Sequence, residues 1–122
     1  MNPVFHLSIG VHSIGDSTKF FVDVLGGKIL YKDPTGYVNL DVFGVQITLR
    51  ESPGINPDSS ELHFGFNLSH ENFNRMAESI RKHHPSCVFA EPTLVDPNTP
   101  LERKKMVLKC PTGYLVELKG YQ

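Results

Sequence analysis

The chain has 122 residues, enough for one domain with a proper core and too few for two independent domains. Hydrophobic residues make up 39% of it, charged residues 20%, and the formal net charge is -1, which is ordinary globular usage. The lysines and arginines are scattered, with no basic stripe interleaved with aromatic residues. The composition therefore excludes the electrostatic pattern of a nucleic-acid-binding protein.

Membrane and secretion signals are equally absent from the sequence. No apolar run reaches the roughly 18 to 20 residues that span a bilayer, and the first residues lack the basic and apolar regions of a signal peptide. The two cysteines, Cys87 and Cys110, lie alone in apolar, strand-like stretches, as reduced thiols that fill space do. We therefore expect a cytoplasmic protein that binds neither membrane nor nucleic acid.

The first half of the chain predicts one strand, one helix and three further strands. Residues 3–10, PVFHLSIG, alternate apolar and polar side chains as a half-buried strand does. Residues 12–27 carry apolar pairs at i, i+4 spacing, with Ser13 or Asp16 as the N-cap and two glycines at the end of the helix. The next strands are KILYKD (28–33), GYVNLDVF (36–43) and VQITLRE (45–51), joined by the turns DPTG and FG.

After a linker rich in proline and glycine, residues 52–60, the same order begins again. Residues 61–68 predict a strand, and Ser69 caps a helix whose apolar positions follow the i, i+3, i+4, i+7 rule and which Pro85 ends. Three more strands are predicted in residues 87–95, 103–110 and 114–121. The expectation is an α+β fold, a single domain of two βαβββ modules covering about 1–51 and about 61–122.

One histidine occupies the same position in each module. His6 in VFHLSIGV aligns with His63 in ELHFGFNL, near the start of the first strand. The alternation of a strand puts Phe5, Leu7 and Ile9 on the face that packs against the helix, and His6 on the other face. A single strand histidine is more often a hydrogen-bonded core residue than a ligand. Two histidines at equivalent positions favour a paired role.

A carboxylate lies on the matching face of the last strand. Glu117 stands between two apolar residues, and the corresponding residue of the first module is Thr48. A carboxylate in such a strand is costly to bury without a partner, and a metal ion is one. Two histidines and a carboxylate bind divalent transition metals and leave positions open for substrate. His6, His63 and Glu117 are therefore candidate ligands of an Fe, Mn, Ni, Zn or Co ion, and the alternative is an ordinary edge-strand glutamate that faces solvent.

These residues carry a resemblance to the vicinal oxygen chelate superfamily, also called the glyoxalase/bleomycin-resistance/extradiol-dioxygenase superfamily. The resemblance covers nearly the whole chain. The first helix of that family ends in a stretch like FYxxxLG, matched here by Phe20, Phe21, Leu25 and Gly26. Its last hairpin, DPxGxxxEL, is similar to CPTGYLVEL here, with Cys110 in place of the aspartate.

The resemblance implies paired βαβββ modules whose curved mixed sheets surround a metal-binding cavity, with the three ligands named above. It also implies a homodimer and a small substrate whose adjacent oxygens chelate the metal, in a lyase, isomerase, dioxygenase or transferase reaction. Glyoxalase I has a further ligand, often glutamate, at the position of Thr48. Threonine is no base at neutral pH, so true glyoxalase I activity is not expected.

Other functions stay open beside this one. A metal-free protein could bind a small molecule or sequester a drug, as bleomycin-resistance proteins do, although members that only sequester lack the ligands. A thiol transferase of fosfomycin-resistance type is a further alternative, because its LCLSRE-like fourth strand is similar to ITLRE here. A scaffold subunit that only dimerises is the weakest reading.

Several polar residues are candidates to contact the substrate or to orient the ligands, and no catalytic residue is assigned. They share the faces on which the histidines and Glu117 lie: Ser8, Gln46, Thr48, Arg50 and Asn67. An anionic substrate could also bind Arg50, Lys104 or Lys105, but lysines in such a segment are more often solvated surface.

Overall fold

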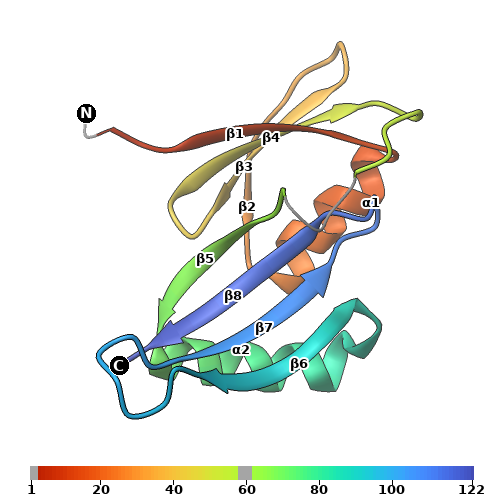
Figure 1. The fold of residues 1–122 in the computed structure, drawn as a ribbon. Coiled ribbons are helices and arrows are strands. Elements are labelled where there is room, and N and C mark those ends of the chain that lie inside the picture. The colour runs from red at the N-terminus through yellow and green to blue at the C-terminus, as the bar shows by residue number, and fades with distance from the viewer. Residues whose placement is uncertain (1–2, 58–61) are drawn as a thin grey trace. The chain divides into compact units, whose positions relative to one another are not determined.

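The computed structural model describes residues 3–57 and 62–122 (Figure 1). The chain divides into two compact units, Met1–Pro57 (unit 1) and Asp58–Gln122 (unit 2). Each unit holds a four-stranded mixed sheet and follows the order β-α-β-β-β. The α+β fold class and the duplicated order of elements are confirmed.

Unit 1 begins with a strand and a helix and continues with three strands. Its elements are β1 (His6–Val11), α1 (Ile14–Lys19), β2 (Lys28–Lys32), β3 (Tyr37–Val42) and β4 (Val45–Glu51). The order in the sheet is β1-β4-β3-β2, with β1 parallel to β4 and the other neighbours antiparallel. Because β4 lies between β1 and β3, its side chains lie beside those of both neighbours on each face of the sheet.

The helix of unit 1 starts at the predicted cap. The Ser13 side chain accepts a hydrogen bond of 3.2 Å from the backbone N–H of Asp16. The helix then widens into a π-helical segment, Phe20–Val24, which the sequence did not predict. Phe20 and Phe21 are consecutive in the sequence and both are buried. A π-helix has more residues per turn than an α-helix, so consecutive side chains point in more similar directions. Gly26, with φ of 75°, ends the segment.

The first strand starts later than predicted. Residues 3–10 were expected to form it, but β1 begins at His6, and Phe5 is 66% exposed. The prediction that Phe5 packs against the helix is therefore wrong, whereas Ile9 is buried as expected. The Phe5 backbone still pairs with β4, since its carbonyl oxygen accepts a hydrogen bond of 2.9 Å from the Gln46 N–H. However, β1 is an edge strand, and the Phe5 side chain is left uncovered at its end.

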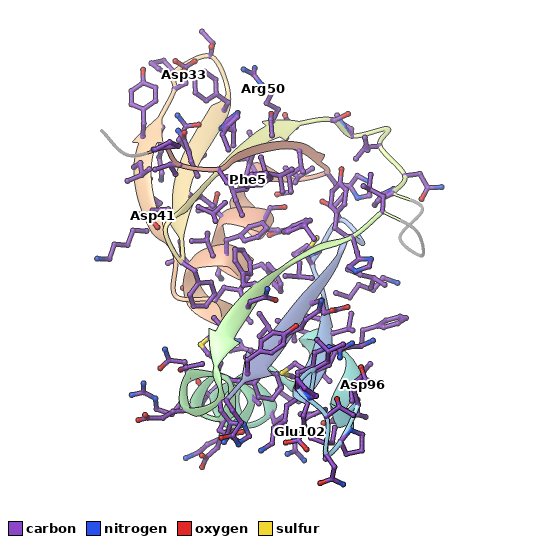
Figure 2. The ribbon with its side chains drawn as sticks, turned by 60° about the vertical axis from the view of Figure 1, so that its left-hand side comes forward. Phe5, Asp33, Asp41, Arg50, Asp96 and Glu102 are labelled. Atoms are coloured by element: carbon purple, nitrogen blue, oxygen red, sulfur yellow. The ribbon has the colours of Figure 1, made fainter. Side chains whose placement is uncertain are left out.

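The β2–β3 turn is closed by its own side chains, as the DPTG motif predicts. The Asp33 carboxylate accepts a hydrogen bond of 2.8 Å from the Thr35 backbone N–H and another from the Thr35 hydroxyl. These hydrogen bonds hold the pKa of Asp33 below its ordinary value. Figure 2 shows Asp33 and Arg50 at the same end of this sheet, with Asp41 at the opposite end.

Unit 2 repeats the arrangement with a longer helix. Its elements are β5 (Phe64–Ser69), α2 (His70–His83), β6 (Val88–Val95), β7 (Arg103–Lys109) and β8 (Leu115–Tyr121). The order is β5-β8-β7-β6, with β5 parallel to β8, and α2 lies along one face of the sheet (Figure 1). Ser69 caps α2 as predicted, accepting from the Asn72 N–H at 3.1 Å.

The core of unit 2 lies between α2 and the sheet. Phe73, Ala77 and Ile80 are the buried residues of the helix, and Val116 and Leu118 are fully buried residues of β8. The other face of β8 is therefore free for the polar residues that alternate with these two. No helix in the described residues is long and apolar enough to cross a membrane.

The predicted linker, residues 52–60, lies partly outside the described residues, which leave out 58–61. Its described part, residues 52–57, forms neither helix nor strand.

Candidate functional site

Two of the predicted metal ligands face each other within unit 2. His63 directly precedes β5, and Glu117 lies on β8, the parallel neighbour of that strand. The His63 Nε2 atom is 3.5 Å from the Glu117 Oε2 atom, and the two side chains are 44% and 12% exposed. Glu117 is thus a largely buried carboxylate, which requires partners for its charge.

The separation of these two atoms fits two ligands of one metal ion. Zinc–nitrogen and zinc–oxygen bonds are about 2.1 Å long, so two donors at a tetrahedral angle around one ion stand roughly 3.4 Å apart. The observed 3.5 Å therefore needs little movement for both atoms to bind one ion. Imidazole nitrogen and carboxylate oxygen also suit the predicted metals chemically.

Gly65 provides the space in which this pair meets. It is the register partner of Glu117, and a Cβ built on it would lie 2.0 Å from the Glu117 carbonyl oxygen. No larger residue fits there unless β5 and β8 move apart. A pocket of about 150 Å³ opens over this position, lined by residues 63–67, Glu117 and Lys119.

Strand alternation puts Gly65 on the same face as His63, but sequence reasoning did not identify its role. The signal that could have revealed it is the glycine itself, since a glycine inside a strand pattern often marks a close approach of another backbone. Asn67, a predicted substrate contact, does line the same pocket.

Lys119 is a second site residue that the sequence did not identify. It lies two residues after Glu117 and therefore on the same face of β8. Its Nζ atom is 3.3 Å from the Glu117 Oε1 atom, while His63 approaches the other oxygen. The two oxygens of the carboxylate thus have different partners, a cation on one side and an imidazole on the other.

Unit 1 brings together a second set of predicted residues. His6 is exposed and pairs in register with Gln46 on β4, and Ser8 pairs with Thr48 two residues further on. Register partners in neighbouring strands point to the same face. His6, Ser8, Gln46 and Thr48 therefore share one face of this sheet, as predicted.

The two units share this register, which confirms that Thr48 is the counterpart of Glu117. Ser8, two residues after His6, is opposite Thr48, and Gly65, two residues after His63, is opposite Glu117.

Thr48 and Arg50 have other partners than a substrate. Thr48 is 5% exposed, and its hydroxyl donates a hydrogen bond of 2.7 Å to the Asn39 side-chain oxygen. The Arg50 guanidinium lies 4.9 Å from the centre of the Tyr37 ring, at the register pair where β3 and β4 approach the β2–β3 turn (Figure 2). Arg50 is thus four positions along β4 from Gln46 and not beside His6.

The two neighbouring lysines of β7 point to opposite faces. The Lys104 Nζ atom donates a hydrogen bond of 3.0 Å to the Asn74 side-chain oxygen on α2, so Lys104 is on the helix face and away from Glu117. Lys105 is the register partner of Lys119 and lies on the Glu117 face. Of the two lysines considered for an anionic substrate, only Lys105 is therefore on the relevant face.

Neither unit alone assembles three metal ligands. In the part of the chain that the structure describes, no group of three His, Cys, Asp or Glu side chains gathers in a way that could hold an ion. Of the three predicted ligands, His63 and Glu117 lie in unit 2 and His6 lies in unit 1. Cys87 and Cys110 are both free, Cys110 is buried, and burial raises the pKa of the Cys87 thiol.

Known protein structures match the whole chain. A glyoxalase/bleomycin resistance protein/dioxygenase from Alicyclobacillus acidocaldarius matches with a TM-score of 0.84 at 24% identity, over 98% of this chain and 92% of that one. The fosfomycin resistance protein FosX from Listeria monocytogenes matches at 0.76 and 14% identity, over 100% and 95%. The chain has the vicinal oxygen chelate fold.

A FosX variant from the same species, complexed with Mn(II) and a dihydroxypropylphosphonic acid, also matches this chain. Its TM-score is 0.74 at 17% identity, over 99% of this chain and 92% of that one. No family model and no curated protein sequence matches this chain. The resemblance found in the sequence is thus confirmed as a shared fold.

Proposed function

We propose that this chain is a metal-dependent enzyme that acts on a small substrate with adjacent oxygens. The observation that carries the proposal is the His63–Glu117 pair, whose facing nitrogen and oxygen are 3.5 Å apart on the face opposite α2. Glu117 is only 12% exposed and Lys119 contacts one of its oxygens, so a divalent ion shared with His63 would supply a partner for the other oxygen.

The proposed ligands are His63 and Glu117 from unit 2 and His6 from unit 1. His6 is exposed at the start of β1, so its imidazole is accessible to an ion. When bound, the divalent ion supplies Lewis acidity that polarises a substrate oxygen and stabilises negative charge on it. The set leaves positions open for two oxygens of a substrate.

The remaining residues of the unit 2 face position the ligands and the substrate. Lys119 holds one Glu117 oxygen, which orients the other oxygen toward His63. Asn67 lines the pocket and can donate or accept a hydrogen bond with a substrate. Gly65 keeps side-chain atoms out of the space over Glu117.

The proposed reaction is of lyase, isomerase, dioxygenase or group-transfer type and differs from that of glyoxalase I. The counterpart of Glu117 in unit 1 is Thr48, whose hydroxyl is buried and donates to Asn39. A hydroxyl in that position cannot take a proton from a substrate carbon as a carboxylate does.

One observation favours an alternative, a metal-free protein that binds a small molecule. Lys119 already compensates part of the Glu117 charge, so the carboxylate has a partner without any ion. A metal titration separates the two functions.

The test is a calorimetric titration of tag-free, chelator-treated protein with Mn(II), Zn(II), Ni(II), Co(II) and Fe(II). We expect one ion per chain for at least one metal. The variants His63→Ala, Glu117→Gln and His6→Ala should each lower the affinity for that ion. The loss should exceed the roughly 10- to 100-fold caused by removing a residue that only hydrogen-bonds a metal ligand.

The matched control is His83→Ala, at the end of α2, which should leave the affinity unchanged. Absence of a stoichiometric ion, or equal affinity of the wild type and His63→Ala, would contradict the proposed enzyme and favour the metal-free binding protein.

A further inference from the structure

The Glu117 face of unit 2 carries an excess of positive charge. Arg103 and Lys105 alternate along β7, and Lys119 lies on β8, directly opposite Lys105 in the register. Register partners point to the same face, so all three cations lie on the face that carries Glu117. The pKa of Arg103 is raised above its ordinary value mainly by the hydrogen bond to Asp96, and the charge of Glu117 makes a smaller contribution.

Two of the three cations, Arg103 and Lys119, already have partners, and the partner of Lys119 is Glu117. The Arg103 Nη1 atom donates a hydrogen bond of 2.7 Å to the Asp96 carboxylate and another of 3.0 Å to the Leu101 carbonyl oxygen. Asp96 and Glu102, both labelled in Figure 2, lie in the segment between β6 and β7, where the Glu102 carboxylate accepts a hydrogen bond of 2.8 Å from the Asn98 N–H. Arg103 is thus held at the end of the face.

Lys105 is the cation that remains. Among residues 3–57 and 62–122 no carboxylate forms an ion pair with it. Its register partner on β8 is a second lysine, Lys119. Like charges directly opposite each other in a sheet destabilise it, and the cost is removed when an anion lies between them.

Metal binding increases this demand for an anion. Under the proposed function, the single charge of Glu117 is shared between the ion at one oxygen and Lys119 at the other, so Glu117 compensates Lys119 less than in the metal-free protein. Two ammonium groups without a full counter-charge would then stand near the metal, on half-buried side chains.

We propose that Lys105 and Lys119 form a subsite for an oxyanion group of the substrate, a carboxylate or a phosphate, next to the Glu117 end of the metal site. The adjacency to a metal rests on the proposed function, whereas the anion subsite itself stands on the lysine pair. Ammonium groups bind such oxyanions through charge-assisted hydrogen bonds.

The test is a calorimetric titration of metal-free protein with inorganic phosphate and, separately, with acetate, at constant ionic strength held with chloride. We expect saturable binding of at least one of the two, and the one that binds identifies the group. Lys105→Gln should weaken this binding by roughly tenfold, because one charge-assisted hydrogen bond is lost.

The matched control is Lys104→Gln, one position away on the same strand. It removes the same charge from the helix face, so the affinity should stay within about twofold of the wild type. Equal losses in the two variants, or no saturable binding in the wild type, would overturn the subsite. Lys105→Gln should not lower the midpoint of unfolding, since it removes a like-charge pair.

A second measurement tests the position of the subsite. In the Mn(II)-loaded protein, bound phosphate should show enhanced phosphorus relaxation, and Lys105→Gln should reduce the enhancement at the same phosphate concentration. Phosphate that binds without this enhancement to protein carrying Mn(II) would refute the adjacency. Failure of all five ions of the metal titration to bind refutes the proposed function instead, and phosphate binding to the metal-free protein then decides the subsite separately.

Discussion

At the scale of single residues, the environment of Glu117 is built from contacts on three sides. His63 approaches one oxygen, Lys119 approaches the other, and Gly65 lies directly opposite in the ladder. The carboxylate can be this deeply buried because the first two supply partners for its charge and the third supplies space.

Substitution of Gly65 should disrupt both the sheet and the pocket. A Cβ at this position would lie 2.0 Å from the Glu117 carbonyl oxygen, which is backbone and cannot rotate away. We expect Gly65→Ala to destabilise the protein by about 1–3 kcal/mol, the range of overpacked sites, and to weaken metal binding. Urea unfolding and the metal titration measure the two effects.

The control for this prediction is Gly54→Ala. A Cβ at Gly54 would meet nothing within 4 Å, so its stability should stay within about 0.5 kcal/mol of the wild type. Equal stability of Gly65→Ala and the wild type would show that β5 and β8 can separate freely.

At the scale of elements, each sheet is organised by the parallel pair of its first and last strands. A histidine begins this pair in unit 1, and another directly precedes it in unit 2. Two residues after each histidine, the residue opposite in the ladder is Thr48 in unit 1 and Glu117 in unit 2. The duplicated element order thus carries two different chemistries, a buried hydroxyl and a carboxylate.

The long helix of unit 2 depends on its N-cap. The Ser69 hydroxyl accepts a hydrogen bond of 3.1 Å from the Asn72 N–H, and Ser69 is also the last residue of β5, the strand that follows His63. Ser69→Ala should lower the free energy of unfolding by about 1 kcal/mol. The measurement is the denaturant midpoint at unchanged slope.

Ser79→Ala, an exposed position of the same helix, is the matched control. Alanine is the better helix former, so this variant should be as stable as the wild type or slightly more stable. A loss of stability equal to that of Ser69→Ala would mean that the hydroxyl does not act as a cap.

At the scale of the whole molecule, the proposed ligands come from two compact units. We expect a homodimer, as the resemblance implies, and each unit exposes large apolar side chains that a partner chain could cover, such as Phe5 and Leu30 in unit 1 and Leu62 in unit 2. Sedimentation should give twice the chain mass of 13.7 kDa. A monomer across the accessible concentrations would contradict this.

A mixture of His6→Ala and His63→Ala chains then reports how the dimer builds its site. Restored metal binding in the mixture requires ligands from two chains. Metal binding that stays absent requires all ligands from one chain.

The sequence alone determined the elements, the duplication and the faces of the strands. These depend on local periodicities, which is why the caps Ser13 and Ser69 and the outward direction of His6, His63 and Glu117 could be predicted. The exposure of Phe5 was missed because alternation predicts the face on which a side chain lies, but not how far along the strand the core extends.

Only the tertiary structure decided which of these side chains meet. The contact of Glu117 with both His63 and Lys119, the close approach at Gly65 and the opposition of Lys105 to Lys119 all follow from the register of β5 and β7 against β8. That register is fixed by packing between strands tens of residues apart, and a shift of one residue would turn every one of these side chains to the other face. Periodicity within a single strand carries no information about it.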